Sequence, residues 1–157
     1  RNTVREAMIY LVAYGFLEKT QRGPRVTTPD IGIAFDIIED AFDRSLETCR
    51  DVLEFRRGID LAIMASVVRN ITPARIEELG RHLDAMRGAL TVSDAAEADC
   101  RFHQVLIDAS GNEVIRRLFL ALRPIIVFYQ EIGKRMPHHD VPSEATHRAI
   151  ITALEER

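Results

Sequence analysis

Apolar residues recur every three or four positions along most of this chain, from about residue 31 to its last residue. Because an α-helix turns once every 3.6 residues, this spacing gathers the apolar side chains on one face of each helix. Turn-forming residues divide the region into six predicted helices, which cover about residues 31–48, 49–69, 72–90, 93–109, 112–135 and 143 onward. Such helices bury their apolar faces against one another, so we expect an antiparallel bundle of about six helices.

The first 29 residues follow a different pattern. Residues 3–16 have helical spacing, with Thr3 placed to cap the helix and Gly15 placed to end it. Extended runs at about 16–20 and 25–28 flank a turn, which predicts a small two-stranded hairpin. The fold class that we expect is therefore mostly all-α, with one short hairpin before the bundle.

Charge divides the chain at the same place. We put a domain boundary after Pro29, which gives a domain of residues 1–29 with net charge +3 and a domain of residues 30–157 with net charge −6. A basic end joined to an acidic body is typical of a polyanion-binding domain attached to a regulatory or catalytic one. Chance unevenness in a short segment is the alternative.

Several protein classes are excluded by composition. No run of about 20 apolar residues is present to span a membrane, and the N-terminus has no signal-peptide core. Two cysteines, Cys49 and Cys100, are too few for a disulfide scaffold, so we expect free thiols. These features predict a soluble cytoplasmic protein. The chain starts and stops inside helical patterns, so we also expect it to be a fragment of a longer protein.

The basic end has the layout of the second half of a winged helix, in which a recognition helix is followed by a β-hairpin. Arg1, Thr3 and Arg5 lie at the start of the helix, where such proteins contact base edges in the major groove. Arg22 and Arg25 are expected at the hairpin tip, in contact with the DNA backbone or minor groove. A solvated helix end and a charged turn are the alternative.

The acidic body contains residues of the kind that bind metal ions. Asp99 and His103 are four apart on one predicted helix, so their side chains leave the same face. His147 lies near the start of the last helix, from which it can reach back across the bundle. Carboxylate and imidazole ligands suit Zn, Ni, Mn or Fe(II) rather than Ca or Mg. A simple hydrogen-bonded pair at the surface is the alternative.

The remaining candidates have simpler interpretations. His138 and His139 are neighbours in a polar loop, so their side chains diverge into solvent. His82 lies beside Arg81 and is expected at the surface. Cys100 points about a quarter-turn away from Asp99, which favours a buried thiol over a ligand.

Several stretches of the chain resemble a known family. The recognition-helix segment 3–8, the Gly15–Glu18 turn and the Arg22–Val26 wing are similar to the DNA-binding domain of GntR-family transcription regulators. The wing differs in having Gln21 where the family usually has a second Gly. The first two helices of that domain are missing from the chain, so it should bind DNA poorly by itself.

The body resembles the effector-binding FCD domain of the FadR subfamily of these regulators. The matching segments are 53–57, 99–103, 109–112 and 144–150. In this family an Asp and three His hold a metal ion, and the resemblance assigns the first three of these ligands to Asp99, His103 and His147. The fourth His is expected about one helix beyond Arg157.

The resemblance also implies how an effector binds. Arg56 matches a family Arg that faces the pocket, where a guanidinium beside a metal ion can clamp a carboxylate. A salt bridge with Glu54 or Asp60 is the alternative role for Arg56. Asp60 itself stands where the family usually has Glu.

Together with the family resemblance, these features predict a transcription regulator and not an enzyme. The resemblance implies that it forms a homodimer, binds a palindromic DNA operator, and responds to a small organic acid or sugar acid held through a divalent metal ion, with Zn or Ni preferred to Mn or Fe. One alternative is a helical metalloenzyme, although the sequence offers no general base beyond the metal ligands. Another is a metal-free helical interaction module.

Overall fold

A computed structural model describes residues 2–28, 43–135 and 143–157 of the chain. The chain divides into two compact units, residues 1–42 and 43–157. The predicted boundary after Pro29 lies outside the described residues. The described part is mostly helical with one two-stranded sheet, which confirms the predicted fold class.

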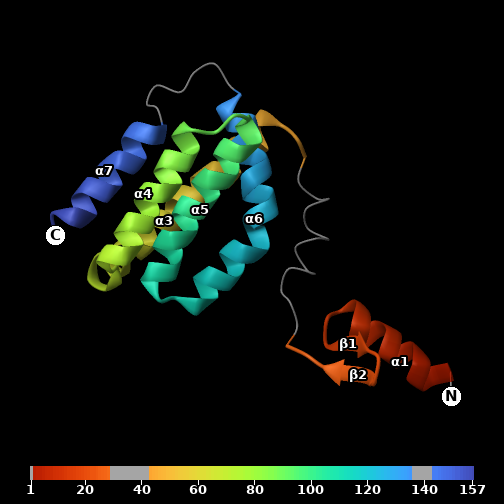
Figure 1. Ribbon diagram of the computed structural model, residues 1–157. Coiled ribbons are helices and arrows are strands. Elements are labelled where there is room, and N and C mark those ends of the chain that lie inside the picture. Colours follow the sequence, from red (N-terminus) through yellow and green to blue (C-terminus); the bar gives the residue numbers. More distant parts are fainter. Residues whose placement is uncertain (1, 29–42, 136–142) are drawn as a thin grey trace. The chain divides into compact units, whose positions relative to one another are not determined.

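The first unit contains helix α1 (Asn2–Ala13) and strands β1 (Leu17–Thr20) and β2 (Gly23–Val26), which form an antiparallel hairpin (Figure 1). Gly15 ends the helix with a positive φ of 71°, as predicted, because a residue without Cβ adopts this left-handed conformation at little cost. The hairpin turn is shorter than expected. Thr20 pairs with Gly23 across it, so Gln21 and Arg22 alone form the connection.

The second unit is a helical bundle. Its described helices are α3 (Leu46–Asn70), α4 (Pro73–Arg87), α5 (Val92–Ser110), α6 (Glu113–Lys134) and α7 (Ser143–Glu155). The sixth helix, predicted over residues 31–48, lies mostly outside the described residues. Its expected end at residue 48 is wrong, because residues 46–48 form the first turn of α3 and the Ser45 side chain caps that helix by accepting a hydrogen bond from the Thr48 N–H.

The other helix starts agree closely with the sequence. Thr72 caps α4, with Pro73 at its first position, and the Asn112 side chain caps α6 by accepting hydrogen bonds from two backbone N–H groups. Gly111 ends α5 with a φ of 73°. These local signals fix where the bundle helices begin and end.

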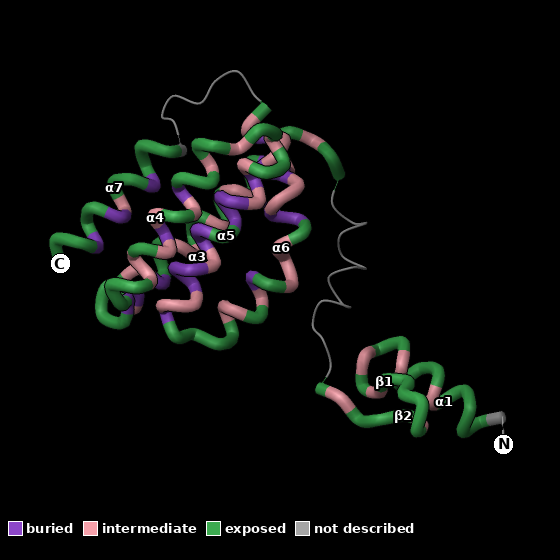
Figure 2. The backbone as a smooth tube through the Cα atoms, viewed as in Figure 1, coloured by how far each residue is buried: buried purple, intermediate pink, exposed green. Residues whose placement is uncertain are grey.

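Helix α5 lies at the centre of the bundle. It packs against α3, α4 and α6, whereas α7 packs against α4 (Figure 1). Buried residues concentrate on the inward helix faces, and α5 has the largest share of them (Figure 2). Phe102 of α5 is completely buried, and loss of its ring in a Phe102→Ala variant should cost about 3–5 kcal/mol of stability. Polar residues on α5 are therefore held on a rigid support.

None of the described helices is long and apolar enough to cross a membrane.

Candidate metal centre

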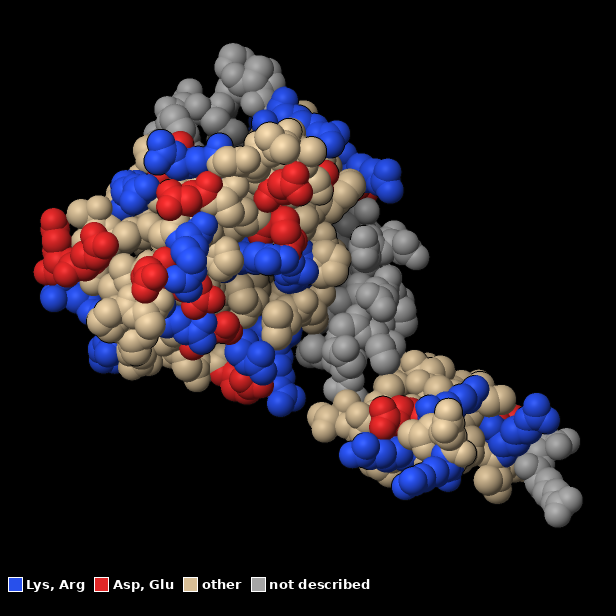
Figure 3. Space-filling view, viewed as in Figure 1, with Lys and Arg blue, Asp and Glu red and all other residues tan. Residues whose placement is uncertain are grey.

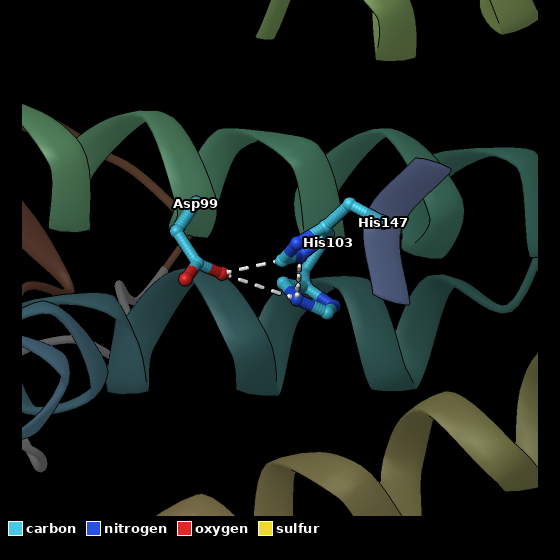
Figure 4. Close-up of side chains that lie close together, drawn as sticks. All are labelled: Asp99, His103 and His147. Carbon is cyan, nitrogen blue, oxygen red and sulfur yellow. Dashed lines mark hydrogen bonds and ion pairs between the residues drawn. The ribbon is translucent and has the colours of Figure 1, made fainter. Parts of the chain in front are cut away.

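Asp99, His103 and His147 meet in the interior of the second unit (Figure 4). They are only 3%, 4% and 4% exposed, respectively. Asp99 and His103 lie one turn apart on α5, as their spacing predicts, and His147 reaches them from α7. The structure thus brings together the three residues that the sequence predicts as metal ligands, from helices separated by more than 30 residues.

The ring of Phe102 packs edge-on against both imidazoles. Its centroid lies 4.4 Å from that of His147 and 5.6 Å from that of His103. Because Phe102 is fully buried, it limits the rotation of both rings and excludes water from one side of them. The hydrophobic core therefore orients the two histidines.

The separations of the donor atoms fit a shared metal ion. Oδ1 of Asp99 lies 3.2 Å from Nε2 of His103 and 3.5 Å from Nε2 of His147, and the two Nε2 atoms are 3.1 Å apart. Ligand atoms bound to one metal ion at about 2.0–2.2 Å lie about 3–3.5 Å from each other. Three donors arranged as a triangle occupy one side of a metal ion and leave its other positions open for further ligands.

Two cationic side chains and an amide surround the same carboxylate. Arg56 of α3 lies with its NH1 atom 3.2 Å from Oδ1 of Asp99, and Lys134 of α6 donates to Oδ2 at 2.8 Å. The amide of Gln130, also on α6, donates to Oδ1 at 3.3 Å. Arg56 therefore reaches the site, as its predicted effector role requires. Its alternative partner Asp60 is also close, with Oδ2 lying 4.0 Å from Nε of Arg56.

These contacts determine the ionisation of Asp99. Burial favours the neutral acid, but contacts with His103, His147 and Arg56 outweigh burial and hold the pKa of Asp99 well below its usual value. The carboxylate thus remains charged in the interior. A charged oxygen next to two imidazole nitrogens is the state that a metal ion requires.

The opposite edge of the His103 ring faces a second carboxylate. Nδ1 of His103 lies 2.9 Å from Oδ2 of Asp60. Burial and Arg56 lower the pKa of His103, but Asp60 and Asp99 outweigh them, so the pKa is raised above its ordinary value. Asp60 therefore lies where it can fix the ring with Nε2 towards the other candidate ligands.

Several buried polar atoms at the site have no hydrogen-bond partner among the described residues. They include Nε of Arg56, Nδ1 of His103, Oδ1 of Asp60 and Oε1 of Gln130, and the approach of Nδ1 to Oδ2 of Asp60 is thus an ion-pair contact. Buried polar atoms normally find partners, because an unpaired one loses its hydration without compensation. These donors and acceptors around the metal-type cluster can therefore form hydrogen bonds with a polar ligand.

Three features of the site are absent from the sequence-based predictions. They are Lys134, Gln130 and the contact from Asp60 to His103. Gln130 and Lys134 are four residues apart on α6, the same spacing that identifies Asp99 and His103. That spacing places both on one helix face, but it carries no information about which helix the face packs against. Helix packing supplies the missing information.

The predictions for the other histidines and for Cys100 agree with the structure to different extents. His82 is half-buried rather than exposed, which corrects its predicted surface position, and it belongs to none of the metal-type clusters in the described residues. His138 and His139 lie outside the described residues. Cys100 is completely buried, as predicted, and burial raises the pKa of its thiol to about 12. Such a thiol is a poor metal ligand.

The candidate DNA-contacting residues lie in the first unit. Thr3 and Arg5 are exposed on the first turns of α1, and Thr3 lies inside the helix, so its predicted capping role is wrong. Arg22 occupies the hairpin turn, as predicted. Arg25 does not, because it lies within β2 opposite Glu18, with 3.6 Å between their charged groups. Arg1 lies outside the described residues.

Figure 3 shows Lys and Arg side chains spread over the visible face of the first unit, with few acidic side chains among them. In the second unit both signs of charge are mixed on the visible face. The charge difference that the sequence predicts between the two parts is therefore expressed at their surfaces. A basic surface attracts the phosphate groups of a nucleic acid whatever the base sequence of that nucleic acid.

Comparisons with known proteins match this chain to one family. A family model described as "FCD domain" matches residues 51–157. The HTH-type transcriptional regulator LutR of Bacillus subtilis (strain 168) is 28% identical over 120 residues, which cover 75% of this chain and 55% of that protein. The chain thus spans about half the length of this curated relative.

A solved structure has the same fold. Streptococcus agalactiae GntR superposes with a TM-score of 0.67 and 23% sequence identity, over 99% of this chain and 72% of that one. At this identity the likeness concerns the fold alone.

Proposed function

The chain belongs to the FCD-domain family of GntR-type regulators, and we propose that it is a DNA-binding transcription regulator whose helical body binds a small carboxylate effector through a divalent metal ion. The observation that carries the proposal is the buried triangle of Asp99, His103 and His147 with Arg56 beside it, inside the matched domain. Membership of the FadR subfamily stays a prediction from the sequence.

The proposed metal ligands are Oδ1 of Asp99 and the Nε2 atoms of His103 and His147. Two imidazoles and one carboxylate favour Zn or Ni, with Mn or Fe as further candidates. When bound, the ion supplies positive charge and open coordination positions at a buried place. Arg56 adds a planar guanidinium that can pair with both oxygens of a carboxylate. A small organic acid or sugar acid therefore finds two kinds of cationic partner at one site.

The first unit supports the DNA-binding part of the proposal. Its exposed α1 carries Arg5, and its hairpin carries Arg22 and Arg25, in the order of recognition helix and wing. Regulators of this layout bind two half-sites as a dimer, so the proposed partner is a palindromic operator and the proposed assembly is a homodimer. Such a regulator acts on DNA in the cytoplasm.

Effector binding can change operator affinity only if the acid binds two arrangements of the protein unequally. The acid contacts residues of α3 and the proposed metal is held by α5 and α7, so a bound acid favours one packing of these helices. A regulator then releases the acid unchanged.

Elemental analysis of the purified protein, combined with mass spectrometry of any co-purifying acid, tests this proposal. We expect about one divalent transition-metal ion per chain and an acid that shifts operator affinity without being converted. Absence of the metal after reconstitution with zinc and nickel would remove the proposed site. Steady conversion of the acid to a product, lost in His103→Ala, would identify an enzyme instead.

A further inference from the structure

We propose that the effector is a dicarboxylate, with one carboxylate paired with Arg56 beside the metal ion and the second paired with Lys134. This inference rests on the proposed function and names its ligand class. It depends on how the described charges around Asp99 balance.

The two cations approach Asp99 from different helices and take different oxygen atoms. Arg56 comes from α3 and contacts Oδ1, whereas Lys134 comes from α6 and contacts Oδ2. Their side chains are only 17% and 19% exposed. The site thus has two separate, largely buried positive charges. A ligand with a single anionic group pairs with Arg56 and leaves Lys134 without a ligand partner.

With both imidazoles neutral, as metal binding requires, the charges of the described side chains around Asp99 balance before the metal ion is counted. Arg56 and Lys134 contribute two positive charges, and Asp60 and Asp99 contribute two negative charges. The charged group of each side chain lies within 4.0 Å of an oppositely charged group among these four. A divalent ion held by Asp99 and two neutral imidazoles adds two positive charges and no negative one. The loaded site therefore has an excess of two positive charges.

Excess charge in a buried place is costly, because the surroundings solvate it poorly. An anion with one charge halves the excess, and an anion with two charges removes it. The metal ion also competes with Arg56 for Oδ1 of Asp99, and Nε of Arg56 already has no partner among the described residues. Both cations are then available to pair with carboxylates of a ligand.

Matched acids test the inference directly. Malonate, succinate and glutarate are compared by calorimetry with their monoamides, malonamate, succinamate and glutaramate, on the zinc-loaded full chain. Each monoamide keeps the length of its diacid and removes one charge. Sulfate serves as a compact dianion whose two charges cannot be placed on separate cations.

We expect the best diacid to bind at least about tenfold more tightly than its monoamide. Lys134→Gln should reduce diacid affinity to that of the monoamide and leave monoamide affinity nearly unchanged, while Lys134→Arg keeps the preference. Arg135→Gln is the matched control, because this neighbouring cation is 69% exposed and pairs with Glu131. Sulfate should bind more weakly than the best diacid.

Equal binding of diacids and monoamides would overturn this inference and leave the proposed function intact, as would a diacid preference that survives in Lys134→Gln. If no acid binds while zinc does, the effector part of the proposed function fails as well. If Lys134→Gln does not retain zinc, the ratio of diacid to monoamide affinity in the unaltered protein and in Lys134→Arg decides the question.

Discussion

Nδ1 of His103 lies 2.9 Å from Oδ2 of Asp60, and Nε2 of the same ring lies towards Asp99 and His147. A histidine that binds metal through one nitrogen is commonly held by a carboxylate at the other. The pairing in this protein joins α3 to α5 and uses a residue that offers no ligand atom to the triangle. Asp60 is therefore expected to act on metal binding through His103.

Replacing Asp60 should weaken metal binding without removing a ligand. We expect Asp60→Ala to lower zinc affinity by about 10–100-fold, the range typical for the loss of such a partner. Asp60→Glu should restore much of it, because the carboxylate remains available to Nδ1. Competition with a chromogenic chelator gives both affinities. Equal zinc affinity in Asp60→Ala and the unaltered protein would show that the contact does not support the site.

Metal affinity should rise with pH. A metal ion binds only the neutral imidazole, so protons compete for Nε2 of His103. Because the neighbouring carboxylates raise the pKa of His103, this competition continues above the ordinary histidine value of about 6.5. Asp99 competes little in this range, because its pKa is lowered. Zinc titrations between about pH 5.5 and 8.5 should show affinity falling steadily towards the acid end, and a flat profile would contradict the assigned ligand.

The removal of either predicted histidine ligand should lower metal occupancy. His103→Ala and His147→Ala each remove one of three donors, whereas His82→Ala should have no effect because His82 lies in no metal-type cluster of the described residues. Cys100→Ser is a second control, since its buried thiol has a pKa of about 12. Metal analysis of the four purified variants, after circular dichroism shows that each is folded, gives the comparison. Unchanged metal content in both ligand variants would exclude the site.

The sequence pattern predicts the parts of the site that depend on residues close together in the chain, and it does not predict the parts that depend on how helices pack. The i, i+4 spacing places Asp99 and His103 on one face of α5 because both lie on the same helix. The positions of Gln130 and Lys134 beside Asp99 depend on how α6 packs against α5, which no local pattern specifies. The family resemblance identifies His147 and Arg56, which local spacing leaves unassigned.

The same distinction applies to the fold. The left-handed Gly15 is a local feature that the structure confirms, and the caps at Thr72 and Asn112 and the left-handed Gly111 are local features of the same kind. Helix α3 starts three residues earlier than the sequence predicts, because the Asp43 carboxylate and the Ser45 hydroxyl organise that end through contacts with Thr48. Such caps are hard to recognise when apolar spacing continues across them.

Two arginines of the first unit should affect DNA binding in different ways. In a protein with a complete winged helix, Arg5→Ala should weaken binding to the specific operator by about 1–3 kcal/mol, as expected for a contact to base edges. Arg25→Ala should weaken binding to all sequences and reduce its salt dependence, as expected for a phosphate contact. Arg101→Ala, an exposed cation of the second unit, is the control. Fluorescence anisotropy over a range of salt concentrations measures all three. Unchanged specific binding in Arg5→Ala would contradict the recognition-helix assignment.

Arg56 should control acid binding while the metal ion remains bound. Its guanidinium is largely buried and contacts Asp99, but it offers no ligand atom to the metal triangle. A carboxylate that loses its hydration at this place needs Arg56 as well as the metal ion, so Arg56→Ala should weaken acid binding by about 2–5 kcal/mol with metal retained.

Arg56→Lys should restore acid binding only partly, because an ammonium group lacks the planar pair of donors that matches a carboxylate. Removing the metal ion with a chelator should weaken acid binding in the unaltered protein, since the two cationic partners act on the same ligand. Calorimetry of succinate binding, with metal content measured in each sample, separates these effects. If Arg56→Ala and the unaltered protein bind the acid equally well, the carboxylate lies elsewhere, and Arg56 serves only to hold Asp60 and Asp99 in the structure.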